Sequence, residues 1–197
     1  IEIAPQDTGS YNNLGNTLKG LGRFEEAELS FKQSIKLNPK SAIAHNNLGT
    51  LLKDTERLDE AKASFEEAIR LNPDFAEAHN NLGLTLVDLY KYEDAEASYN
   101  RAIKLNPNFA EAHNGLGTVF KEQGKLEEAI EAYKKAILLK PDYAGVYNNI
   151  GVALSNQEKF DEAIDAFKKA ILLKPDYAEA YNNLGNILHE LDKLEES

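Results

Sequence analysis

Cysteine is absent from this sequence of 197 residues, which excludes disulfides, thiolate catalysis and cysteine-bound metals. No apolar run approaches the roughly 20 residues that a membrane-spanning helix needs, and no segment resembles a signal peptide. Motifs for phosphate loops, nucleophile elbows and zinc proteases are missing as well, so we expect neither an enzyme active site nor a cofactor. Methionine is absent even from position 1, so we expect the numbering to begin inside a larger, cytoplasmic protein.

Positive charge is scarce, because 22 Lys and Arg residues face 33 Asp and Glu residues and the net charge is −11. A phosphate backbone or an anionic membrane surface would be repelled, and no cluster of Lys and Arg offsets this repulsion. We therefore expect no nucleic-acid partner and no membrane partner. Hydrophobic residues still make up 42% of the chain, which is enough to bury a core.

The few prolines of the chain all follow one period of 34 residues. They are Pro5, Pro39, Pro73, Pro107, Pro141 and Pro175. A fixed period of this length indicates a stacked array of helical or similar repeats, in which each unit contacts mainly its neighbours. The period therefore predicts a binding surface rather than a catalytic pocket.

Other residue types recur with the same period. A glycine column contains Gly15, Gly49, Gly83, Gly117, Gly151 and Gly185, and an aromatic column contains Phe31, Phe65, Tyr99, Tyr133 and Phe167. Alanine forms a third column, Ala27, Ala61, Ala95, Ala129 and Ala163. Two helices approach closely only where the residues at their crossing are small, so these columns predict tight helix packing with an aromatic ring beside each close contact.

Each unit shows the apolar spacing of two amphipathic helices, followed by a stop at a proline such as Pro73. Acidic or amide residues after the proline suggest capping boxes at the next helix start. The candidate pairs are Asp74 with Glu77, Asn108 with Glu111, and Asp176 with Glu179. Each unit therefore reads as helix, turn, helix and proline turn.

These columns resemble the tetratricopeptide repeat over essentially the whole chain, as in the unit with Leu82, Gly83, Ala95, Tyr99 and Pro107. The resemblance implies an all-α fold: an α-solenoid of antiparallel helix pairs, wound as a right-handed superhelix whose first helices line a concave groove. Five full repeats fit residues 8–41, 42–75, 76–109, 110–143 and 144–177. Residues 1–7 are expected to be the tail of a preceding repeat, and residues 178–197 a partial sixth repeat whose second helix begins near Lys193.

Two neighbouring columns of asparagine are the strongest candidates for a binding site, and we call them the asparagine ladder. The first column is Asn12, Asn46, Asn80, Asn114, Asn148 and Asn182, and the second is Asn13, Asn47, Asn81, Asn149 and Asn183, with Gly115 as its one break. A side-chain amide can donate to a peptide carbonyl and accept from a peptide N–H, so a row of amides can hold an extended peptide without reading its sequence. Either column could instead hydrogen-bond to neighbouring helices and hold the array together.

The second column also resembles the asparagine ladder of O-linked N-acetylglucosamine transferases, and a similar one in kinesin light chains. The resemblance implies a groove that binds an extended protein or peptide segment. Two alternatives stay open: a substrate-recruiting arm of such a transferase, whose catalytic domain is absent here, and a scaffold that self-associates end to end through uncapped termini. A second binding mode of the family clamps a carboxylate with cations. Asn12, Asn16 and Asn47 fit its neutral positions, but Glu77 and Asn81 stand where cations are needed.

Further positions along the first helices are expected to face the groove and differ between repeats. They are Asn16, Lys19, Thr50, Lys53, Leu84, Val87, Asp88, Thr118, Lys121, Val152, Asn156, Asn186 and His189. A third column, His45, His79 and His113, is read either as a metal row or as a packing position that accepts any flat ring. Since rings one repeat apart are poorly placed for ligand distances of about 2 Å, packing is the favoured interpretation.

Overall fold

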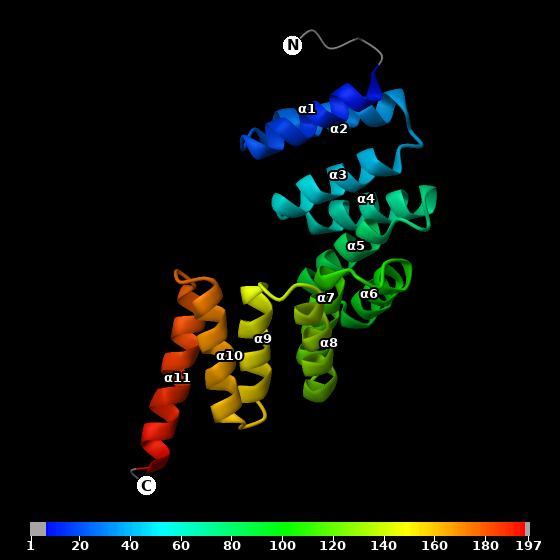
Figure 1. The fold of residues 1–197 in the computed structure, drawn as a ribbon. Coiled ribbons are helices and arrows are strands. Elements are labelled where there is room, and N and C mark those ends of the chain that lie inside the picture. The colour runs from blue at the N-terminus through cyan, green and yellow to red at the C-terminus, as the bar shows by residue number, and fades with distance from the viewer. Residues whose placement is uncertain (1–6, 196–197) are drawn as a thin grey trace. The chain divides into compact units, whose positions relative to one another are not determined.

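The structure is a computed structural model that describes the backbone of residues 7–195 and the side chains of residues 7–191. The described part contains eleven helices and no strand, which confirms the predicted all-α class of helix pairs (Figure 1). They are α1 (Thr8–Gly20), α2 (Phe24–Leu37), α3 (Ala42–Asp54), α4 (Leu58–Leu71), α5 (Ala76–Asp88), α6 (Tyr92–Leu105), α7 (Ala110–Glu122), α8 (Leu126–Leu139), α9 (Ala144–Ser155), α10 (Phe160–Leu173) and α11 (Ala178–Glu195).

The chain divides into two compact units, Ile1–Asn106 and Pro107–Ser197. The N-terminal unit holds α1 to α6 and the C-terminal unit holds α7 to α11. The predicted tail of a preceding repeat falls almost wholly on residues 1–6, which lie outside the described residues. None of the described helices has the length and apolar character needed to cross a bilayer.

A residue with a positive φ angle, in the left-handed region, lies just after the end of the first helix of each complete pair. The five residues share the period of the prolines, and their φ angles lie between 58° and 76°: Gly22, Glu56, Tyr90, Gly124 and Glu158. The next N–H then reaches back to a carbonyl of the last helical turn, as Arg57 N does to Leu52 O at 2.9 Å. This closed turn reverses the chain and sets the two helices antiparallel.

Five glycines of the glycine column each lie directly against one ring of the aromatic column. A Cβ atom at these glycines would come within 2.5 to 2.9 Å of a ring carbon: Gly15 against Phe31, Gly49 against Phe65, Gly83 against Tyr99, Gly117 against Tyr133, and Gly151 against Phe167. All five rings are buried, with at most 1% of their surface exposed. The predicted packing of small residues beside aromatic rings is therefore confirmed.

The predicted capping boxes are wrong. Helix α5 begins at Ala76 with Phe75 in the N-cap position, and no side chain caps it. The Asn-Pro-Asp-Phe turn explains the offset: Asn72 Oδ1 accepts from Asp74 N at 3.3 Å, and Asn72 O accepts from Phe75 N at 3.1 Å. The turn therefore extends through Phe75, one residue beyond Asp74, where the capping box would place the N-cap. Asp74 accepts instead from Arg101 Nη2 at 2.9 Å.

The other two predicted boxes fail for the same reason. Helix α7 has Phe109, not Asn108, in its N-cap position, and α11 begins at Ala178, one residue later than a cap at Asp176 requires. Side-chain caps occur elsewhere: Asp7 accepts from Gly9 N at 3.0 Å, and Ser41 Oγ accepts from Ala44 N at 3.3 Å. A side-chain oxygen therefore caps these helices only where it directly precedes the first helical residue.

Helix α11 also differs from the expectation that a second helix begins near Lys193, because it continues without a turn to Glu195. In the complete repeats, the turn is followed by a helix of 14 residues that packs back on the first.

Candidate functional site

The two asparagine columns bond to each other, from one repeat to the next. In every pair, the Nδ2 of a second-column residue donates to the Oδ1 of the first-column residue 35 positions earlier. The pairs are Asn47 with Asn12 (3.0 Å) and Asn81 with Asn46 (3.1 Å) in the N-terminal unit, and Asn149 with Asn114 (3.0 Å) and Asn183 with Asn148 (3.0 Å) in the C-terminal unit. The ladder is thus a set of hydrogen bonds between neighbouring first helices.

Three members of the first column lie beneath the second, whereas Asn12 and Asn114 are half-buried and Asn182 is exposed. Asn46 and Asn148 are 1% exposed and Asn80 is 5% exposed. Asn46 Nδ2 donates to Glu77 Oε1 at 3.5 Å, and Asn148 Nδ2 donates to Glu179 Oε1 at 3.1 Å. Since an ionised carboxylate only accepts, these bonds fix which end of the first-column amide faces the second column. Two of the three glutamates predicted to cap helices, Glu77 and Glu179, therefore orient these two amides, whereas Glu111 pairs with Lys140.

The second column is half-exposed at Asn47, Asn81, Asn149 and Asn183. Each amide uses one of its two N–H groups on the first column, so the other N–H remains. Except at Asn81, whose oxygen accepts from Asn80 Nδ2 at 3.4 Å, no bond to a described group occupies the amide oxygen. These amides can both donate and accept toward a ligand.

Four of the predicted site residues, Asn13, Asn16, Asn80 and Asn182, lie outside these four pairs. Asn13, Asn16 and Asn182 are exposed, and within the described residues they form no side-chain bond to another asparagine. At the break in the second column, counting 35 residues on from Asn80 reaches Gly115, which has no side chain. Asn80 Oδ1 is buried and has no hydrogen-bond partner among the described residues.

Ion pairs follow the same offset as the asparagine pairs. Lys19 Nζ lies 2.8 Å from Asp54 Oδ2, and Lys53 Nζ lies 3.0 Å from Asp88 Oδ2. Both pairs join the first helices of neighbouring repeats. Lys19, Lys53 and Asp88 are among the positions expected to face the groove, but their pairing was not predicted, although the offset of 35 residues between a lysine and an acid is visible in the sequence.

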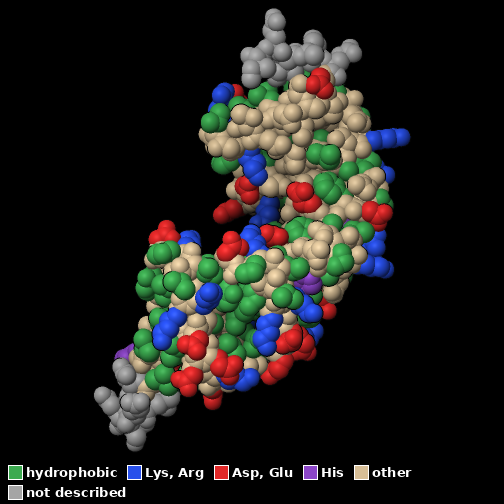
Figure 2. Space-filling view, in the orientation of Figure 1, with side chains coloured by type: hydrophobic (Ala, Val, Ile, Leu, Met, Phe, Trp, Pro, Cys, Tyr) green, Lys and Arg blue, Asp and Glu red, His purple; other side chains and the backbone are tan. Residues whose placement is uncertain are grey.

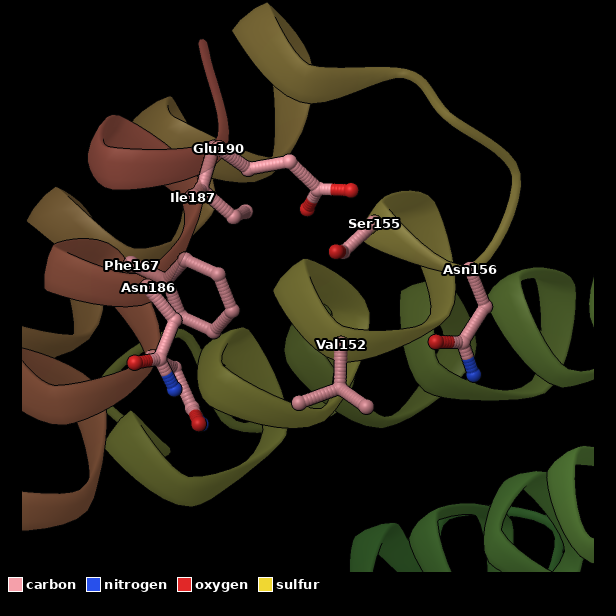
Figure 3. A pocket seen from close by; sticks show the side chains of 8 residues that line it. Val152, Ser155, Asn156, Phe167, Asn186, Ile187 and Glu190 are labelled. Carbon is pink, nitrogen blue, oxygen red and sulfur yellow. The ribbon is translucent and has the colours of Figure 1, made fainter. Parts of the chain in front are cut away.

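A pocket of about 200 Å³ opens among α9, α10 and α11 in the C-terminal unit (Figure 3). It is lined by Val152, Ser155, Asn156, Phe167, Asn183, Asn186, Ile187 and Glu190. Val152, Asn156 and Asn186 are among the positions expected to face the groove, and Asn183 belongs to the ladder. In this unit the structure therefore brings ladder and variable positions together on one surface.

The histidine column stabilises the proline turns. The Nε2 atoms of His45, His79 and His113 lie 3.2, 3.0 and 3.1 Å from the carbonyl oxygens of Pro39, Pro73 and Pro107. A carbonyl only accepts, so each imidazole donates from Nε2. Across the described residues, no three His, Asp or Glu side chains are grouped so that they could hold a metal ion.

Acidic and basic side chains are interspersed over the face of the molecule seen in Figure 2. The sequence has a net charge of −11 and contains no cluster of Lys and Arg.

Sequence profiles for tetratricopeptide repeats match nearly the whole chain. Profiles described as "TPR repeat" match residues 49–89, 85–124, 117–158 and 153–192, and profiles described as "Tetratricopeptide repeat" match residues 10–41 and 30–63. No curated protein sequence matches the chain.

Solved structures of tetratricopeptide repeat proteins superpose well on the chain. YrrB, described as "a TPR protein with an unusual peptide-binding site", is 28% identical with a TM-score of 0.70, over 90% of this chain and 91% of YrrB. MamA is 31% identical with a TM-score of 0.72, over 87% of this chain and 94% of MamA. TTC0263 of Thermus thermophilus shares the fold at 21% identity and a TM-score of 0.77, over 92% and 99% of the two chains. The chain belongs to the tetratricopeptide repeat family.

Proposed function

We propose that this chain is a protein-interaction module that holds an extended peptide by its backbone, through the second column of the asparagine ladder. The observation that carries the proposal is the orientation of that column. Each paired second-column amide is held by a first-column asparagine, and it keeps an N–H, and in three of the four an oxygen, free of described partners. The description of YrrB as a protein with a peptide-binding site supports the same kind of function.

The chemistry of the amide suits a peptide backbone. A peptide unit offers one N–H and one carbonyl, and a fixed side-chain amide can meet both. Because the amide is already oriented, binding loses less side-chain entropy than binding to a freely rotating amide. Each net hydrogen bond contributes about 0.5–1.5 kcal/mol, so a few amides bind weakly and pockets for ligand side chains must add affinity.

The test compares variants that break the same bonds from opposite sides. Asn47→Ala with Asn149→Ala removes one second-column amide from each compact unit, whereas Asn12→Ala with Asn114→Ala breaks the same two hydrogen bonds and leaves those amides in place. The probe is the peptide of highest affinity selected from random peptides of about twelve residues. About three residues of extended peptide span the spacing between neighbouring repeats. Its affinity is measured by isothermal titration calorimetry, and the melting temperature of each variant by circular dichroism.

We expect similar losses of melting temperature in the two double variants, since each loses two bonds. We expect peptide affinity to fall at least about tenfold in the second-column variant and much less in the first-column variant. N-methylation of the peptide backbone should weaken binding more than exchange of most of its side chains. Equal affinities in the two double variants would show that the ladder only joins the repeats.

A further inference from the structure

The ion pairs of the N-terminal unit define a register that repeats along the first helices. A lysine on one first helix meets an acid 35 positions later, on the next first helix: Lys19 with Asp54, and Lys53 with Asp88. In both pairs the acid lies at the same position of its repeat. The chain thus shows how an acid at this position is neutralised, by an ammonium group 2.8 to 3.0 Å away.

In the C-terminal unit, the same offset of 35 residues leads from Ser155 to Glu190. The acid is therefore present, but serine occupies the position of the lysine. Figure 3 shows the Glu190 carboxylate directed across the pocket toward Ser155. Among the described side chains, no cation lies within ion-pair distance of Glu190. Lys121, one repeat before Ser155, is bound to its neighbour Glu122 at 2.9 Å.

We propose that the pocket among α9, α10 and α11 binds a lysine side chain of the peptide, whose ammonium group takes the position that an internal lysine fills in the N-terminal unit. Glu190 pairs with the ammonium. The half-buried side chain of Val152 contacts the methylene groups, since a lysine buries its stem on apolar surface and keeps its charge at a polar edge. This assignment rests on the proposed function, because the lysine belongs to the peptide that the ladder holds.

The size and charge of the pocket support one basic side chain as its occupant. At about 30 Å³ per water molecule, 200 Å³ holds roughly seven waters, below the range of about 300–1,000 Å³ that is typical for small-molecule sites. Asn183, which belongs to the ladder, lines the same pocket, so a peptide held by that amide passes its mouth. The net charge of −11 also favours a basic ligand over an acidic one.

The test uses random peptides of about twelve residues displayed on phage, selected separately on the unaltered chain and on three variants. Ser155→Lys supplies the internal lysine, and Glu190→Gln removes the acid. Glu162→Gln is the matched control, because it removes one exposed acid from α10 away from the pocket. The tightest peptide is then titrated into each protein, together with its analogue in which norleucine replaces lysine.

We expect lysine to be enriched at one peptide position on the unaltered chain and on Glu162→Gln, and to lose that enrichment on Ser155→Lys and Glu190→Gln. The norleucine analogue should bind roughly two- to fivefold more weakly than the lysine peptide, as expected for an exposed ion pair, and the difference should shrink in high salt. It should disappear in both pocket variants.

The outcomes separate this inference from the proposed function. Peptides that bind the unaltered chain with no lysine preference, or with a preference that both pocket variants retain, overturn the lysine pocket and leave the peptide groove standing. Failure to select any peptide overturns the groove itself, and the pocket with it.

Discussion

Replacing Gly151 of α9 by alanine should destabilise the chain, whereas the same change at Gly185 of α11 should stabilise it. A Cβ atom at Gly151 would lie 2.6 Å from Cε1 and 2.8 Å from Cδ1 of Phe167. That ring is 1% exposed and packs in the core of the C-terminal unit, so it has no free space to move into. At Gly185, the equivalent position of α11, no described atom lies within 4 Å of the added Cβ.

The magnitude follows from two opposing effects. Alanine is favoured over glycine inside a helix by about 0.8–1.0 kcal/mol, and both positions gain this contribution. Overpacking a filled core costs about 1–3 kcal/mol, and only Gly151→Ala incurs it. We therefore expect Gly185→Ala to stabilise the chain by up to about 1 kcal/mol and Gly151→Ala to be less stable than Gly185→Ala by about 1–3 kcal/mol.

Urea denaturation followed by circular dichroism measures this difference. In a chain of this size, each kcal/mol shifts the melting temperature by about 2–4 °C, so thermal melts should separate the two variants. A second substitution tests the cause: adding Phe167→Leu to Gly151→Ala should recover part of the loss, because the smaller side chain leaves room for the methyl group. Equal stability of the two alanine variants would refute the explanation that ring contact requires glycine.

Two further predictions concern the turns and an ion pair. Glu158→Gly should stabilise the folded chain by up to about 1 kcal/mol, because Glu158 has a positive φ of 60°, which glycine adopts more readily. Gly124→Ala should destabilise the chain for the same reason, since Gly124 has a φ of 76°. Urea denaturation measures both changes. The Arg57 and Lys32 side chains lower the pKa of Glu28, so its pairing stabilises the fold above the ordinary pKa of 4.5 and is lost as pH falls through the lower, folded-state pKa. Glu28→Gln should thus reduce stability at neutral pH and not near pH 2; a constant deficit would contradict this.

The helix pairs could be predicted from the sequence because a period of 34 residues aligns residues that have the same environment. Gly151, Ala163 and Phe167 occupy positions that are filled in the same way in every complete repeat, so their packing was visible as columns. The asparagine bonds were not, because they join different columns at an offset of 35 residues. Aligning equivalent positions shows what each repeat contains, and it hides contacts between unlike positions of neighbouring repeats.

The capping boxes failed for a more local reason. The spacing of Asp74 and Glu77 matches a capping box, but the turn after Pro73 places Phe75 in the N-cap position. Sequence spacing does not reveal this one-residue difference, because it depends on the hydrogen bonds that Asn72 makes within the turn. The same shift leaves Glu77 close to Asn46, where it orients the ladder.

Structural and binding roles of the asparagine ladder are therefore compatible. A half-exposed amide that rotated freely would lose entropy on binding, whereas Asn183 is fixed by Asn148, which is itself fixed by Glu179. Under the proposed function, the buried Asn148 thus acts on binding without contacting the ligand, because it orients Asn183. At Gly115 the sequence supplies no second-column amide, and the buried Asn80 Oδ1 has no partner among the described residues. Gly115 therefore lacks the one group to which the proposed function assigns peptide binding in its repeat.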